Sequence, residues 1–285
     1  MKIGFIGAGK AGCSLSGYLK GSSVTISGFC SKTYAHAKRA ADDTLSVAFS
    51  DLKQLISISD IIFITTPDSM ISKVWEEIRA LAADKVQITG KIFCHCSGSR
   101  SSLIFEHIQE LGAFRCAAHP MRAISSRDTD LTGTFFTLDG DEEAVSVIGE
   151  LLKNKGNPVS IIDSACKVKY HMASSAASNL MVALADLAAE ALAECGFSSQ
   201  RALEMLTPLM MGNMENICTK GTAEALTGPV ERGDCDTVQK HLSQLSGEDK
   251  EIYRLLSGRL VQIARKKNPE RNYSVLEHLL EEKNQ

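Results

Sequence analysis

Short apolar runs alternate with amphipathic stretches along the first half of the chain. The run Asp60–Thr65 is apolar at nearly every position, which is typical of a parallel strand covered on both faces. The same signal predicts strands at Lys2–Ile6, Val24–Phe29, Lys91–Cys96, Arg115–His119, Thr134–Leu138 and Val159–Ile162, with a weaker one at Ser46–Phe49. Strands that alternate with helices build βαβ units. The pattern therefore predicts an α/β domain with a doubly wound parallel sheet.

Helices are expected between these strands. Their pattern places them at about Ala11–Lys20, Tyr34–Ala41, Ser69–Leu81, Ser101–Leu111 and Asp141–Lys153. The last of them opens with the run Asp139-Gly140-Asp141-Glu142-Glu143. We interpret these carboxylates as residues that stabilise the positive end of a helix.

The strand signals stop after about Asp163. One long helix is predicted over Ser164–Cys195, and a second begins at Ser199. Thr207-Pro208 should kink or split the second helix, because proline cannot donate a backbone hydrogen bond. Further helices are predicted at Asp236–Leu245, Lys250–Arg265 and Ser274–Glu282. The chain is thus expected to hold an α/β domain over residues 1–163 and an all-helical domain over residues 164–285.

Composition narrows the class of protein. The chain has 285 residues, of which 44% are hydrophobic and 23% charged, and its net charge is −3, so neither a disordered chain nor a nucleic-acid-binding surface is indicated. We recognise no leader and no apolar run of the roughly 18 residues that a membrane span needs. The nine cysteines, an odd number, favour free thiols in a reducing compartment. We therefore predict a soluble cytoplasmic protein without a membrane or nucleic-acid partner.

A glycine-rich turn follows the first predicted strand and opens the first helix. Its sequence, Gly7-Ala8-Gly9-Lys10-Ala11-Gly12, has the dinucleotide-binding spacing in the strand–turn–helix context that this motif requires. Gly7 would permit the tight turn, Gly9 would let the backbone approach a pyrophosphate, and Gly12 would let the helix pack closely on the strand. These six residues are the predicted pyrophosphate site of a Rossmann domain, and a glycine turn without a ligand is the alternative.

The end of the second strand indicates which dinucleotide is bound. NAD sites usually carry an acidic residue there, which holds the ribose 2′-hydroxyl. This chain has Ser31 and Lys32 instead, and no acid before Asp42. A hydroxyl beside an ammonium group suits a 2′-phosphate. We therefore favour NADP(H) over NAD(H), with a merely solvated Lys32 as the alternative.

Further ligand-facing residues are expected where later strands end, because ligands of doubly wound sheets lie beyond the carboxyl ends of the strands. Thr66 and Pro67 follow one strand and Ser97 and Gly98 follow the next, so both pairs should border the cofactor. His119 ends the strand after that. It is a candidate general acid or base, since imidazole titrates near neutral pH.

A polar stripe lies near the start of the predicted long helix. His171, Ser174, Ser175, Ser178 and Asn179 share an arc of roughly 140° at about 100° per residue. On so apolar a helix, the stripe faces either solvent or a ligand in a cleft between domains.

If the stripe faces a ligand, His171 is the leading candidate for general acid or base and His119 is the competitor. Ser97 and Asn179 would then orient the substrate or the nicotinamide, and Ser175 and Ser178 would line the substrate. Arg232, in a Gly-Pro-rich link between helices, would hold an anionic group of the substrate. A rigid turn with no ligand is an equal alternative for this link.

Metal chemistry is not indicated. His95 lies between Cys94 and Cys96 on a predicted strand, so its side chain points to the face opposite the two thiols. This is poor geometry for a metal site, and we interpret both cysteines as core residues.

Taken together, these residues resemble a known family, the bacterial Rossmann-like proteins with a C-terminal helical domain of unknown function. The resemblance covers essentially the whole chain. It is carried by Gly7-x-Gly9-x-x-Gly12, Thr66-Pro67-Asp68, His95-Cys96-Ser97-Gly98, His119-Pro120, Tyr170-His171 with Ser178-Asn179, and Gly228-Pro229-Val230-x-Arg232-Gly233-Asp234. The family is distantly related to 6-phosphogluconate dehydrogenase, β-hydroxyacid dehydrogenases, pyrroline-5-carboxylate reductase and prephenate dehydrogenase.

The resemblance implies a helical domain like that of 6-phosphogluconate dehydrogenase, a nicotinamide cofactor that is usually NADP(H), and a dimer formed through the helical domain. Asn179 matches the helix asparagine of β-hydroxyacid dehydrogenases, but Ser175 stands near the position of their catalytic lysine. We therefore expect hydride transfer to or from a small polar, carboxylated carbonyl/hydroxyl or imine/amine substrate. A non-catalytic NADP(H)-binding sensor is the alternative.

A homodimer is also predicted from the residues themselves. Six large apolar side chains crowd one short stretch, which is more than one amphipathic face can bury. They are Leu203, Met205, Leu206, Leu209, Met210 and Met211. Burial inside a monomer is the alternative.

Overall fold

The computed structural model describes residues 1–21 and 23–281. The chain divides into two compact units, Met1–Ser178 and Asn179–Gln285. The sequence signals change from alternating to all-helical near Asp163. The first compact unit nevertheless extends beyond that point and includes the helix that follows Asp163. The assignment of a separate role to each part of the chain stays a prediction.

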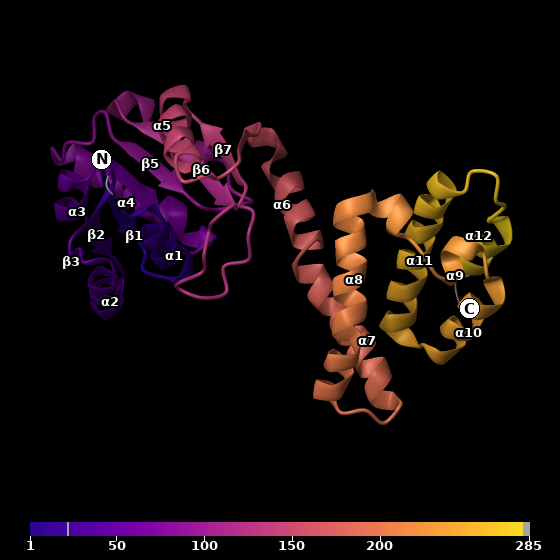
Figure 1. The fold of residues 1–285 in the computed structure, drawn as a ribbon. Helices are drawn as coiled ribbons and strands as arrows, with labels where there is room; N and C mark the ends of the chain where they lie inside the picture. The colour runs from indigo at the N-terminus through magenta and orange to yellow at the C-terminus, as the bar shows by residue number, and fades with distance from the viewer. Residues whose placement is uncertain (22, 282–285) are drawn as a thin grey trace. The chain divides into compact units, whose positions relative to one another are not determined.

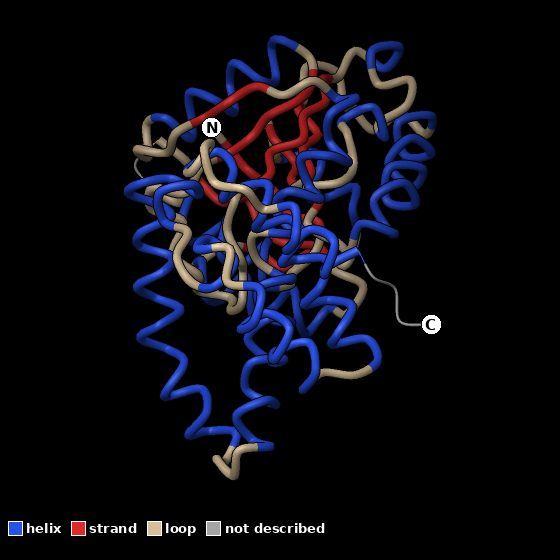
Figure 2. Tube along the Cα trace, turned by 90° about the vertical axis from the view of Figure 1, so that its right-hand side faces the viewer, coloured by secondary structure: helices blue, strands red, loops and turns tan. Residues whose placement is uncertain are grey.

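The first unit contains an eight-stranded sheet (Figures 1 and 2). Its strands lie in the order β3-β2-β1-β4-β5-β6-β7-β8. They are β1 (Lys2–Ile6), β2 (Thr25–Cys30), β3 (Val47–Phe49), β4 (Ile61–Ile64), β5 (Ile92–His95), β6 (Phe114–Pro120), β7 (Phe136–Gly140) and β8 (Val159–Ile161). The first six are parallel in the 3-2-1-4-5-6 order of the Rossmann fold, which confirms the predicted doubly wound sheet.

Two strands extend the sheet beyond the parallel part. β7 runs antiparallel to β6, and β8 runs parallel to β7. A parallel return would need a crossover element, usually a helix, and the connection from Met121 to Phe135 contains none. The antiparallel strand was not predicted, because the sequence signal for a strand carries no direction.

Helices cover both faces of this sheet and bury one apolar cluster on each side (Figures 1 and 2). One cluster includes α1 (Lys10–Leu19), α2 (Tyr34–Thr44) and α5 (Glu142–Lys153). In it, the ring of Phe5 stacks on Phe29 and Phe63 at centroid distances of 5.3 and 5.5 Å. The other cluster includes α3 (Leu52–Ile58) and α4 (Ile71–Ala83), whose Trp75 packs edge-on against Phe93.

The prediction of a helix at Ser101–Leu111 is wrong. The structure has two short 3-10 turns there, η2 (Ser102–Ile104) and η3 (Gln109–Leu111). His107 between them has a φ of 61°, a left-handed conformation that a continuing helix excludes. The amide of Ser102 donates to the carboxylate of Asp139 at 2.7 Å, so a long-range bond replaces a local one at the start of this segment.

The single long helix predicted over Ser164–Cys195 is also wrong. A 3-10 turn η4 (Ser164–Cys166) leads into α6 (Lys167–Ala176), and α7 (Asn179–Glu194) follows after a break at residues 177–178. At the break, the Ser178 hydroxyl donates to the Ser174 carbonyl at 2.8 Å. The Ser178 amide donates to the Ser175 carbonyl at 3.3 Å, a bond of the 3-10 type in place of an α-helical one. The two compact units also divide at this break.

The second unit consists of helices. They are α7, α8 (Ser199–Ala225), α9 (Pro229–Arg232), α10 (Cys235–Gln244), α11 (Gly247–Lys267) and α12 (Ser274–Glu281). The predicted interruption of α8 is misplaced: the helix continues through Pro208 and breaks at Gly221, where φ is 80° and ψ is 168°. Asp234 caps α10 by accepting from the amide of Thr237, and Tyr273 is the largest side chain of the buried cluster in this unit.

One stretch passes a length-and-composition test for a membrane span, which the sequence analysis did not expect. It is Ser164–Glu194, with a mean hydropathy of 1.4 and few buried residues. The stretch comprises η4, α6 and α7, and one such stretch is weak evidence for a membrane span, because the core helix of a soluble protein passes the same test. Its α6 part also carries a buried lysine and a polar stripe, which a lipid-facing helix would avoid.

Candidate functional site

The glycine turn has the geometry that its sequence predicts. Gly7 has a φ of 107°, and a Cβ on it would lie 2.8 Å from the backbone of Thr65. A Cβ on Gly12 would lie 2.5 Å from Thr65 Oγ1 and 2.7 Å from the Gly7 carbonyl oxygen. By contrast, a Cβ on Gly9 would meet no atom within 4 Å. Gly7 and Gly12 therefore serve the fold, while the space at Gly9 is open to a ligand.

The edge of the turn also fits a dinucleotide. Gly9 and Lys10 are exposed where α1 begins, so the first amides of the helix face solvent. Across the turn, Thr66 Oγ1 is buried and has no hydrogen-bond partner among the described residues. The Thr66 amide nitrogen lies 2.9 Å from the position of a Cβ on Gly7, so Thr66 borders the glycine turn. Ser31 and Lys32 lie after β2 at the same carboxyl edge, and Lys32 is exposed.

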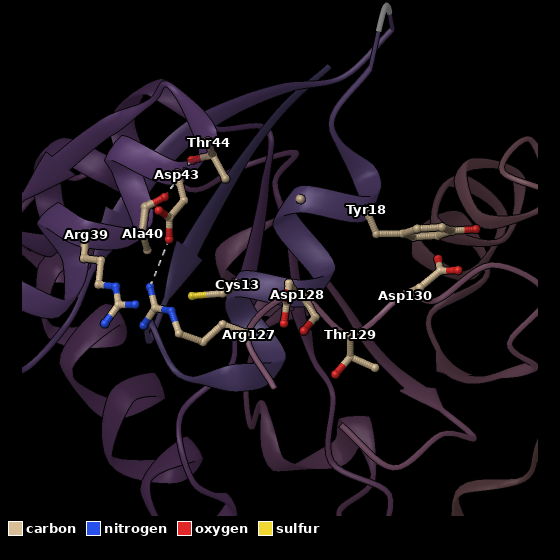
Figure 3. A pocket seen from close by; sticks show the side chains of 12 residues that line it. Cys13, Tyr18, Arg39, Ala40, Asp43, Thr44, Arg127, Asp128, Thr129 and Asp130 are labelled. Atoms are coloured by element: carbon tan, nitrogen blue, oxygen red, sulfur yellow. Dashed lines mark hydrogen bonds and ion pairs between the residues drawn. The ribbon is translucent and has the colours of Figure 1, made fainter. Parts of the chain in front are cut away.

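Arg127, which the sequence analysis missed, reaches the glycine turn from the β6–β7 connection. Its guanidinium donates to the Ala8 carbonyl at 3.1 Å and lies 3.5 Å from the Asp43 carboxylate. Arg127 and Asp43 line a cavity of about 710 Å³ between α1, α2 and the connection, and Figure 3 shows Arg39 among the other side chains that line it. No local pattern distinguishes Arg127 from a surface arginine.

Two histidines meet over the loop that follows β5. His119 ends β6 and His171 lies on α6, and their ring centroids are 6.3 Å apart. Gly98 lies directly against both rings: a Cβ there would be 2.6 Å from His171 Cδ2 and 2.8 Å from His119 Nε2. The hydroxyl of Tyr170 is 2.8 Å from His119 Nδ1. His119, Gly98 and His171 are thus brought together by three separate elements, which are β6, the loop after β5 and α6.

The two predicted acid/base candidates differ in their surroundings. Burial, followed by the positive charge of Lys167 and by His171, lowers the pKa of His119 to about 4. His119 is therefore a neutral imidazole at neutral pH, with Nε2 against Gly98. His171 is half-buried on the polar face of α6. On the same face, the Ser174 hydroxyl donates to the Met121 sulfur at 3.0 Å, which ties α6 to the end of β6.

The side chain of Ser97 forms hydrogen bonds with Asp68 and with the backbone of its own loop. Its hydroxyl donates to the Asp68 carboxylate at 2.5 Å and accepts from the Arg100 amide at 3.0 Å. Ser99 also donates to Asp68, at 3.2 Å. Asp68, which follows Thr66-Pro67, was not among the predicted site residues, and it links the end of β4 to the loop after β5.

His95 is a structural residue. Its Nδ1 accepts from the Ser97 amide at 3.2 Å, so its Nε2 carries the proton and donates to the Ser101 carbonyl at 3.2 Å. Burial lowers the pKa of His95 to about 4 and raises that of Cys96 to about 12. Among the described residues, no group of three His, Cys, Asp or Glu side chains could hold a metal ion.

A buried ion pair beneath this loop was missed entirely. Lys167 Nζ lies 3.6 Å from Asp139 Oδ2, and the two side chains are 1% and 2% exposed. The interpretation of Asp139 as a helix-terminal carboxylate is wrong, because it lies in β7 with its side chain in the interior. Lys167 opens α6 one turn before His171.

The remaining predicted site residues are distributed over both units. Ser175 is half-buried and Ser178 exposed at the end of the first unit. Asn179 and Arg232 belong to the second unit, so their part in the site stays a prediction.

The comparisons with known proteins match two family models along the chain, and the second match begins within the first compact unit. Residues 1–120 match the family described as Rossmann-like domain, and residues 134–260 match a domain of unknown function, DUF2520. The chain therefore combines a Rossmann-like domain with a DUF2520 domain. A search of the curated proteins finds no match to this sequence.

Solved structures share the fold across the whole chain. A proposed NADP oxidoreductase from Bacteroides fragilis is 20% identical, with a TM-score of 0.73 over 92% of this chain and 98% of that one. A protein from Thermotoga maritima is 23% identical, with a TM-score of 0.72 over 93% and 99%. An imine reductase from Myxococcus stipitatus in complex with NADP+ is 17% identical, with a TM-score of 0.60 over 99% and 100%. At these identities the likeness shows the fold.

Proposed function

We propose that this protein is an NADP(H)-dependent oxidoreductase that transfers hydride to or from a small polar substrate. The substrate is a carboxylated carbonyl/hydroxyl or imine/amine compound. One observation carries the proposal: two histidines, His119 and His171, converge on Gly98 at the sheet edge where the glycine turn leaves room for a dinucleotide. Structural neighbours named as NADP oxidoreductases and as an imine reductase with bound NADP+ support the same chemistry.

The cofactor roles follow from the first unit. Residues 7–12 would bind the pyrophosphate through the open face at Gly9 and the amides of α1, and Ser31 and Lys32 would hold the 2′-phosphate. Thr66, Pro67 and Gly98 would border the nicotinamide half. When bound, the nicotinamide supplies or accepts the hydride.

We assign the proton transfer of the proposed reaction to His171. His119 is held neutral in a buried position beside Tyr170, so its role is to donate or accept a hydrogen bond through Nε2. His171 lies across Gly98 from it, on the polar face of α6. Ser97 supports the loop, Ser175 and Ser178 would line the substrate, and Asn179 and Arg232 would reach it from the second unit.

A substrate screen tests the proposal. Keto acids, imino acids and aldehydes are assayed by NADPH oxidation with the full chain. His171→Ala should lower turnover by ~10²–10⁴-fold, the usual contribution of general acid–base catalysis, while NADPH affinity stays within a few-fold. His36→Ala, an exposed histidine on α2, is the control and should turn over normally.

The outcomes separate the alternatives. Normal turnover in His171→Ala would pass the role to His119. A broad screen without any substrate, combined with tight NADPH binding, would overturn the enzyme proposal in favour of an NADP(H) sensor.

We also propose that the protein is a cytoplasmic homodimer. Large apolar side chains of α7 and α8 are exposed on the single chain: Leu180 is 60%, Val182 70%, Leu209 70% and Met211 66% exposed. A second copy would cover this surface, as the resemblance of the helical domain implies. All nine cysteines are free, which suits a reducing compartment. Light scattering that gives a monomer mass at micromolar concentration would refute the dimer.

A further inference from the structure

The ion pair of Lys167 and Asp139 lies behind the histidines and both of its members bind the loop after β5. Lys167 Nζ donates to the Ser97 carbonyl at 3.2 Å. Asp139 Oδ1 accepts from the Ser102 amide at 2.7 Å. The pair therefore attaches to both ends of the segment Ser97–Ser102, from α6 on one side and β7 on the other.

Stability alone does not explain this pair. Taking two charges out of water costs about as much as their attraction returns, and apolar residues of similar volume often serve a core as well. The geometry here is not that of a tight pair either, since the closest separation is 3.6 Å and Asp139 Oδ2 makes no hydrogen bond with any described residue. What the charges do achieve is to hold the backbone of one loop at two points.

That loop is the floor of the histidine site. Gly98 follows the carbonyl that Lys167 binds, and it contacts the rings of both His119 and His171. Lys167 also lies on the same helix as Tyr170 and His171, with its ammonium 5.8 Å from the Tyr170 ring. One side chain thus connects the loop under the histidines with the helix that carries His171 and Tyr170.

We propose that Lys167 and Asp139 are positioning residues for the histidine site: they fix the Ser97–Ser102 loop beneath His119 and His171 and place the ammonium group of Lys167 behind His119. This inference rests on the proposed function, but its central consequence can be measured without a substrate. Neither residue touches the reacting atoms, since both side chains are sealed from solvent.

The expected pKa of His119 depends on every charged or titratable group that faces it. They are Lys167, Tyr170 and His171 from α6, Asp68 from the end of β4, and His95 from β5. Burial is the largest cause of the low pKa of His119, and Lys167 is the next; Asp68 acts in the opposite direction. Removal of the ammonium should therefore raise the pKa of His119, and removal of a more distant lysine should not.

The experiment is an NMR titration of the histidine side chains in the full chain. In Lys167→Met, which keeps the length of the side chain, the pKa of His119 should rise from about 4 by about one pH unit, and the amide signal of Gly98 should move. Lys169→Met is the matched control, because Lys169 is exposed on the same helix. Lys167→Met/Asp139→Asn removes both charges and serves as the second variant if the single one does not fold.

With a substrate in hand, turnover should fall at least tenfold while the KM for NADPH stays within about twofold. The proposal is overturned if His119 titrates in both Lys167 variants as it does in Lys169→Met. It is also overturned if NADPH binding and turnover fall together, since that marks a structural role. A shifted pKa with no substrate found would leave the positioning role standing and contradict only the enzyme proposal.

Discussion

Two glycines at the same edge of the sheet lack a side chain for opposite reasons. At Gly9, in the turn after β1, a Cβ would meet no atom within 4 Å. At Gly98, in the loop after β5, a Cβ would collide with the rings of two histidines. The first glycine leaves space that the protein itself does not use, and the second lets the protein fill space with its own side chains.

This difference separates the proposed cofactor-binding half of the candidate site from its proposed catalytic half. The glycine turn is built by neighbours in sequence, and its shape is set by backbone conformation. The histidine loop is built from β5, β6, β7 and α6, and its shape is set by side chains that arrive from distant parts of the chain. Substitutions in the glycine turn should therefore change NADPH affinity, whereas substitutions in the histidine loop should change turnover and stability.

The largest effect is expected at Gly98. Gly98→Ala should lower turnover by at least ~10²-fold, because a displacement of about 1 Å in a catalytic group costs that much. It should also lower the free energy of unfolding by about 1–3 kcal/mol through overpacking. The measurements are steady-state kinetics and urea denaturation.

Gly17→Ala is the matched control, since Gly17 is helical and has open space at its Cβ position. An alanine at position 98 that leaves both kinetics and stability at the wild-type level would show that the histidines are not held against the loop.

Acid should weaken the fold through the two buried histidines. The pKa of His95 and His119 is lowered from 6.5 to about 4 in the folded chain, so below pH 6.5 the unfolded chain binds protons that the folded chain does not. The contribution of these histidines to the free energy of unfolding is therefore fully present above pH 6.5 and is lost as the pH drops towards 4. The full difference is about 3 kcal/mol for each histidine, at about 1.4 kcal/mol per pH unit.

Urea denaturation between pH 7 and pH 4.5 measures this dependence. His119→Gln should remove one of the two contributions, whereas His36→Gln should leave the slope unchanged. A pH dependence that is identical in wild type and His119→Gln would contradict the burial of a neutral His119.

At the glycine turn, a substitution should change NADPH affinity but leave the stability of the fold nearly unchanged. Gly9→Ala places a methyl group where the pyrophosphate would lie, so NADPH affinity should fall at least about tenfold, or about 1.4 kcal/mol. The free energy of unfolding should change by less than about 1 kcal/mol, since nothing in the protein contacts that position. Calorimetric titration and denaturation measure the two effects, with Gly17→Ala again as the control. Unchanged NADPH binding in Gly9→Ala would place the pyrophosphate elsewhere.

The smallest effect concerns the choice of cofactor. Lys32→Asp should reduce the preference for NADPH over NADH by about tenfold, since a charge-assisted hydrogen bond is worth roughly 1.5–3 kcal/mol. Lys53→Asp, at an exposed lysine on α3, should leave the ratio unchanged. The wild-type protein binding NADH as tightly as NADPH would contradict the assignment of Ser31 and Lys32.

The sequence by itself determined the features that depend on local rules. The eight strands, the conformation of Gly7 and the close packing at Gly12 follow from hydrophobic period and backbone sterics, and the structure shows them. The residues at strand ends were also predictable, because parallel strands end at one edge. His119 and Gly98 could therefore be placed at the site from their positions in the chain.

Only the tertiary structure decided which long-range contacts override local preferences. The amide of Ser102 binds Asp139, 37 residues away, instead of continuing a helix. Lys167 and Asp139 gave no signal, since a lysine that opens a helix and an aspartate before a helix both appear ordinary in sequence. Their pairing exists because β7 returns antiparallel to β6 and places Asp139 under the loop of Gly98, and no local pattern contains the direction of that strand.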